Sequence, residues 1–122
     1  MEMAVELATQ YGKIYVTDEV ISVLAGSAAL DCYGLVGMAS RNQFKDGIAE
    51  LLRRDNLSRG VEVHRDEEGV LTIDLYIVVS YGTKISVVAH NVQTKVKYML
   101  GEVAGLQVDS VNIFVQGVRI AE

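Results

Sequence analysis

The spacing of apolar residues predicts that strands and helices alternate along the chain. Residues 12–16 (GKIYV) read as a short strand, and apolar side chains then recur at helical intervals over residues 18–33. Thr17 is a typical N-cap residue, and Gly34 is typical of the position that follows a helix. A strand-like segment is expected at residues 35–38. The apolar stripe of the helix expected at residues 18–33 comprises Val20, Ile21, Leu24, Ala25, Ala28 and Cys32.

The middle of the chain predicts a short helix and a β-hairpin. Apolar residues at helical spacing over residues 44–52 indicate a helix that ends before Gly60. Residues 61–65 alternate, with the valines directed inward and Glu62 and His64 outward. The sequence Asp-Glu-Glu-Gly at 66–69 is typical of a turn. Residues 70–81 form the strongest strand, apolar enough to be covered on both faces for part of its length.

The last third predicts a long helix and a final strand. The helix is expected from Lys84 to about Val103, and the strand over residues 108–118. The apolar stripe of this helix comprises Ile85, Val88, Val92, Val96, Met99 and Val103. A right-handed crossover makes the final strand parallel to the 70–81 strand. We therefore predict an α+β two-layer sandwich, with two long helices packed on one face of a mixed β-sheet and a C-terminal β-β-α-β unit.

Composition narrows the class of protein. The 122 residues are 50% hydrophobic and 22% charged and include no proline, which predicts one folded domain over residues 1–122. The single cysteine excludes an intrachain disulfide and a zinc site built from several cysteines. A net charge of -5 argues against binding to nucleic acid through bulk electrostatics, so a nucleic-acid partner is not expected.

The N-terminal and apolar segments predict a cytoplasmic protein. A signal peptide begins with positively charged residues, whereas the first charged residues here are Glu2 and Glu6, so a signal peptide is not expected. The most apolar stretch, residues 20–40, is interrupted by Asp31, and its run before that residue is too short to span a membrane. We expect no direct membrane insertion, so that any membrane association depends on a partner protein.

The sequence contains none of the catalytic motifs sought. Phosphate-binding glycine loops, the GxSxG nucleophile elbow and the HExxH zinc motif are all absent. His64 reads as a surface histidine on a strand, His90 faces solvent or a neighbouring chain, and Cys32 reads as an inert core thiol. Asp74 interrupts the strongest strand and is either solvated or part of a partner surface. We therefore expect no enzyme activity and no catalytic, metal or cofactor site.

Two elements are candidates for contact with a partner. One is the long helix, whose polar side chains include a basic group, and the other is an edge strand, which offers unpaired backbone groups. The helix residues proposed for this surface are Lys84, His90, Gln93, Lys95 and Lys97. Basic residues near the short helix leave an RNA-binding module as a further alternative, which would need exposed aromatic side chains.

Three segments resemble a known family. They are residues 12–40, 71–100 and 108–120, and the most specific parts read IDLYIVVSYG, AHNVQTKV and VNIFVQGV. In this order they resemble the alkaline shock protein family of Gram-positive bacteria, also called the Gls-type envelope stress response family. The resemblance covers most of the chain, and this chain looks like the short housekeeping branch because it lacks long charged tails.

The resemblance implies a role that the residues alone do not give. It implies a cytosolic, non-enzymatic interaction or scaffold protein of cell-envelope homeostasis or stress response. It also implies self-association, and protein partners such as a membrane anchor protein. The alternative is a regulatory partner of a dihydroxyacetone-kinase-like fatty-acid kinase. The family has no catalytic residues to carry over.

Overall fold

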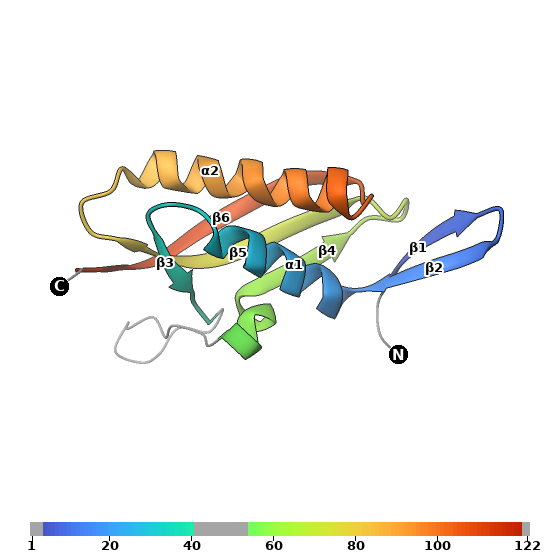
Figure 1. The fold of residues 1–122 in the computed structure, drawn as a ribbon, viewed down its shortest axis with the longest axis horizontal. Coiled ribbons are helices and arrows are strands. Elements are labelled where there is room, and N and C mark those ends of the chain that lie inside the picture. The colour runs from blue at the N-terminus through green and yellow to red at the C-terminus, as the bar shows by residue number, and fades with distance from the viewer. Residues whose placement is uncertain (1–3, 41–53, 121–122) are drawn as a thin grey trace.

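The protein is described by a computed structural model that covers residues 4–40 and 54–120 (Figure 1). The strands are β1 (Ala4–Thr9), β2 (Gly12–Thr17), β3 (Leu35–Met38), β4 (Val61–Arg65), β5 (Leu71–Ser80) and β6 (Val108–Arg119). The helices are α1 (Asp18–Leu30), the 3₁₀ helix η1 (Arg54–Gly60), α2 (Ile85–Tyr98) and the π-helical turn η2 (Met99–Val103). The predicted α+β class, with two α-helices and a mixed sheet, is confirmed. The helix predicted at 44–52 lies outside the described residues.

Strand β5 is the centre of the main sheet. On one side it pairs along its whole length with β6, and the two strands are parallel, as the crossover rule predicts. On the other side it pairs antiparallel with β4 over its first half and with β3 near its end. The hairpin between β4 and β5 turns at residues 66–69, where Asp66 Oδ1 accepts hydrogen bonds from the backbone N–H groups of Glu68 and Val70. The predicted hairpin is therefore confirmed.

The core lies between this sheet and both α-helices. The odd-numbered residues of β5 are fully buried and belong to the same apolar cluster as residues from α1 and α2. Because alternate side chains of a strand point to opposite faces, both helices cover the same face of the sheet. Even-numbered β5 residues are half-buried on the other face, and Val78 is fully buried there. Coverage of both faces over part of the strand is thus confirmed.

The helices depart from the predicted stripes at their ends. Val88, Val92 and Val96 are buried as expected, whereas Ile85 and Val20, each in the first turn of its helix, are exposed. At the end of α2 the backbone widens into the π-helical turn, in which the Ala104 N–H donates to the Met99 carbonyl. Leu100 is buried because it continues the spacing of four residues from Val96, whereas the wider turn rotates Val103, which is 64% exposed.

A two-stranded arm at the N-terminus corrects the prediction for this region. The segment at residues 12–16 is a strand, but β2 pairs with β1 in a separate sheet and does not join the main one. The arm projects beyond the N-terminal start of α1 (Figure 1). Arg65 fastens its base, since its Nη1 donates to the Ala4 carbonyl at 2.6 Å and its Nη2 forms an ion pair with Asp18.

Gly34 offers a test of the packing between α2 and the turn before β3. Its φ of +89° is one that side chains rarely adopt, and a Cβ here would lie 2.6 Å from Val88 Cγ2. We predict that Gly34→Ala lowers the free energy of unfolding by about 1–2 kcal/mol for the backbone, plus about 1–3 kcal/mol for overpacking. The measurement is urea denaturation.

Gly69→Ala is the matched control for the Gly34 variant. Gly69 has a similar φ of +83°, but a Cβ there meets nothing within 4 Å. Gly69→Ala should therefore lower the free energy of unfolding by the backbone contribution alone. Equal destabilisation of the two variants would contradict the proposed clash with Val88.

Candidate interaction surface

The five residues predicted as a partner surface, four in α2 and one at its N-cap, do not share one flank of the helix. Gln93 and Lys97 face β6, where each makes a contact with the strand. Lys95 lies on the opposite flank beside Cys32. Lys84 is the N-cap residue of the helix, and both it and His90 are exposed. The structure therefore does not bring the five side chains together on one face, and their role in binding a partner stays a prediction.

The contacts of Gln93 and Lys97 cover part of a sheet edge. Within the described residues β6 pairs with β5 alone, so its other side is an edge of the sheet. Gln93 Nε2 donates to the Val111 carbonyl at 2.8 Å, and Lys97 Nζ lies 3.5 Å from the Asp109 carbonyl. Residues one helical turn apart thus reach carbonyls two residues apart along the strand. Side chains that satisfy edge carbonyls in this way block the addition of another strand.

The contacts from α2 side chains to the edge carbonyls of β6 do not continue to Ala89. This residue lies one turn before Gln93, and its methyl group cannot form a hydrogen bond. Alternate residues of a strand direct their backbone groups to the same edge, so Ile113 and Val115 follow Val111 in facing outward. From Val111 to Val118 the strand has no charged residue and no proline, the two features that most often protect an edge. Among the residues that the structure describes, no strand covers the second half of β6, which is an uncharged edge.

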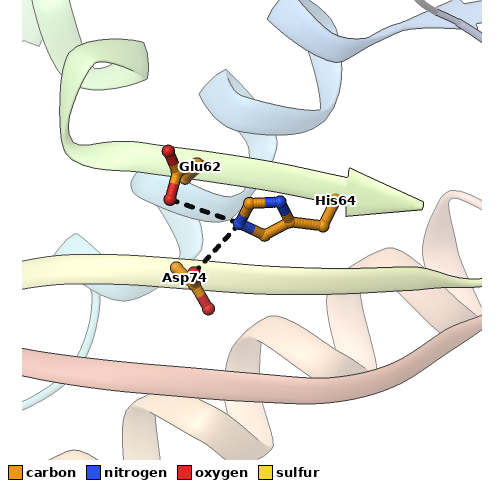
Figure 2. A group of neighbouring side chains, drawn as sticks. All are labelled: Glu62, His64 and Asp74. Atoms are coloured by element: carbon orange, nitrogen blue, oxygen red, sulfur yellow. Dashed lines mark hydrogen bonds and ion pairs between the residues drawn. The ribbon is translucent and has the colours of Figure 1, made fainter. Parts of the chain in front are cut away.

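The sheet face away from the helices is polar at one end and aromatic at the other. Tyr76 and Phe114 stack with ring centroids 4.9 Å apart and an angle of 14° between planes. At the other end, His64 Nε2 lies 3.2 Å from Glu62 Oε1 and 3.1 Å from Asp74 Oδ2 (Figure 2). These three residues are the cluster, within the described part of the chain, whose atoms could together hold a cation. Sequence reasoning missed this cluster because it treated His64 and Asp74 separately.

Cys32 is only half-buried, which corrects the expectation of a core thiol. Its Sγ lies 3.8 Å from the carbonyls of Ala28 and Asn91. Burial raises the pKa of the thiol, Lys95 opposes this, and Asp31 adds to it. A raised pKa leaves little thiolate, the reactive form, near neutral pH.

None of the helices in residues 4–40 and 54–120 has the length and apolar character that a membrane crossing requires.

The edge contact of Gln93 predicts a measurable loss of stability. Gln93→Ala removes a partly buried hydrogen bond to Val111, so the free energy of unfolding should fall by about 1 kcal/mol. His90→Ala, an exposed site on the same helix, should change it by less than about 0.5 kcal/mol. Chemical denaturation compares the two, and a Gln93 variant as stable as wild type would contradict a role at the edge.

The environment of Cys32 predicts slow alkylation. Iodoacetamide should modify the native thiol more slowly than the same thiol in urea at equal pH, because the raised pKa reduces the thiolate fraction. Lys95→Met should slow the reaction further, since Lys95 lowers this pKa. Lys84→Met, at the start of α2, serves as the control and should leave the rate unchanged. A faster reaction after the Lys95 change would contradict this interpretation.

Comparison with known proteins places the chain among close relatives. Residues 6–120 match the model of the alkaline shock protein 23 family, which is described as having a cell envelope-related function. "Uncharacterized protein YloU" of Bacillus subtilis is 63% identical over 97% of this chain and 98% of its own. "Uncharacterized protein Spy1614" of Streptococcus pyogenes is 41% identical over 97% of both chains. "Uncharacterized protein YqhY" of Bacillus subtilis is 35% identical over 91% of this chain and 80% of its own. The chain therefore belongs to the alkaline shock protein 23 family, whose function is related to the cell envelope.

Proposed function

We propose that this protein is a non-enzymatic scaffold of cell-envelope homeostasis that assembles through the edge strand β6. The family gives the cellular setting, and the open half of β6 is the observation that carries the mechanism. The strand that adds to this edge is β6 of a second copy. Any location at the membrane would then come from a partner protein bound to the assembled chain.

The length and chemistry of β6 support this mode of assembly. It has 12 residues, more than any other strand described, and pairing with β5 over most of that length already holds its backbone extended. A strand fixed in this way loses little further conformational entropy when another strand pairs with it. Main-chain hydrogen bonds would then supply affinity, as in other cases of strand addition.

The side chains of the open edge favour a second copy as the added strand. Phe114, Val115 and Val118 are exposed, so pairing would remove apolar surface from water. The protein carries a net charge of -5, which opposes association in general. Because residues 111–118 are uncharged, two copies can approach at this edge without placing like charges opposite each other.

The chemistry of the thiol supports a non-enzymatic role. Cys32 is the only cysteine, and burial raises its pKa, which makes it a poor nucleophile.

Charged residues on the edge should disrupt the assembly. The double variant Val115→Lys with Val118→Lys places on this edge the charged side chains that protect natural edge strands, so self-association should weaken at least about tenfold, or about 1.4 kcal/mol. Sedimentation velocity across a concentration series measures the change. The matched control is Val20→Lys with Val23→Lys on α1, since exposure of 47% and 43% there resembles the 36% and 46% at Val115 and Val118.

A second variant tests the same edge without adding charge. Ala89→Gln extends the series of Gln93 and Lys97 by one turn and places an amide near the Ile113 carbonyl. It should also weaken self-association, while circular dichroism confirms that each variant is folded. A wild-type protein that is monomeric at every concentration, or edge variants that associate like the α1 control, would overturn the proposal.

A further inference from the structure

Glu62, His64 and Asp74 meet on the sheet face that the helices leave open (Figure 2). Glu62 and His64 are two residues apart on β4, so both point away from the core, where Val61 and Val63 point. In the antiparallel register Glu62 lies directly opposite Asp74 on β5. We propose that these three residues form a site for a divalent transition metal, with Zn²⁺ as the ion that fits best.

The distances around His64 are those of a ligand set. Its Nε2 lies 3.2 Å from Glu62 Oε1 and 3.1 Å from Asp74 Oδ2, and the three atoms lie within 4.8 Å of one another. Zinc binds nitrogen and oxygen at about 2.0–2.2 Å, so neighbouring ligands in a tetrahedron lie roughly 3.3 Å apart. The two distances from Nε2 fit this spacing, and the two carboxylate oxygens, which lie within 4.8 Å of each other, need to lie within about 4.4 Å of each other to bind one ion.

A single ring nitrogen lies between two carboxylate oxygens in this arrangement. An imidazole nitrogen carries at most one proton, so Nε2 can direct one strong hydrogen bond to one of the two carboxylates. The other carboxylate oxygen still lies within 3.2 Å of it. The two carboxylates also face each other across the strand pair, and like charges in that position destabilise a sheet. A divalent cation accepts lone pairs from all three atoms and offsets the repulsion between the two carboxylates.

A neighbouring strand orients one of the ligands. Asn112 on β6 donates from Nδ2 to Asp74 Oδ1 at 2.9 Å, which directs the other oxygen, Oδ2, toward His64. Partners of this kind fix the orientation of metal ligands and raise affinity. The Asp74 side chain is only 14% exposed, so it is held in place by the sheet on both sides.

The ligand types select the class of metal. One imidazole and two carboxylates suit Zn²⁺ and related transition ions, whereas Mg²⁺ and Ca²⁺ prefer oxygen ligands alone. Three protein ligands leave a fourth position of a tetrahedral ion open. The site faces solvent, with 53% of the His64 side chain and 40% of the Glu62 side chain exposed, so this position is accessible to water or to another small ligand.

Isothermal titration of the full chain, freed of metal and without a histidine tag, tests the site. The titrant is a zinc salt, and wild type should bind one equivalent per chain. His64→Gln, Glu62→Gln and Asp74→Asn should each weaken binding at least about tenfold, and Asn112→Ala, at a positioning residue, by about 10–100-fold. Titration with magnesium or calcium salts should give much weaker binding.

The chain offers matched controls. His90→Gln removes the only other histidine, and Cys32→Ser removes the only thiol, and both should bind Zn²⁺ like wild type. In NMR spectra Zn²⁺ should shift the ring signals of His64 and leave those of His90 in place, which reports the site even if a variant fails to fold. Absence of zinc binding, equal binding by the His64 variant, or tighter binding of Mg²⁺ than of Zn²⁺ would overturn the proposal.

Discussion

The burial of β5 is the interaction on which the rest of the structure depends. Leu71, Ile73, Leu75, Ile77 and Val79 are all fully removed from water, and burial of such side chains contributes about 1.5–3 kcal/mol each. Both helices pack on the face that these residues form, and three other strands take their register from the same backbone. The open edge and the polar cluster are consequences, because β5 determines which residues of β4 and β6 lie next to it.

Much of the fold could be predicted because its elements carry clear local patterns. The bounds of β4 at Val61–Arg65 follow from simple alternation, and the parallel placement of β6 follows from the handedness of crossovers. The arm of β1 and β2 could not be predicted in the same way, because the attachment of its base involves Arg65, which is far away in sequence. The π-helical turn that exposes Val103 likewise has no local signal in the apolar spacing.

The candidate sites show a different limit of sequence reasoning. Helical position alone places the five predicted residues on one element, yet Gln93 and Lys97 turn toward β6 because that strand lies beneath one flank. The cluster of Glu62, His64 and Asp74 could be predicted from the hairpin register. A turn at residues 66–69 pairs Glu62 with Asp74, and His64 then lies diagonally opposite the same aspartate. Asp74 interrupts an apolar strand, and asking which residue faces it across the hairpin would have brought the three together.

The two register shifts between β5 and β6 limit how an assembly can grow. They fall near Asp109 and Gln116, where β6 has one residue more than its partner, and each shift changes which backbone groups reach the edge. A straight strand therefore finds a matching row of donors and acceptors only along the segment between them. If β6 pairs with its own copy as proposed, the interface would be isologous, so it would use the same edge of both chains and close on itself. This geometry favours a discrete dimer over an open-ended fibre.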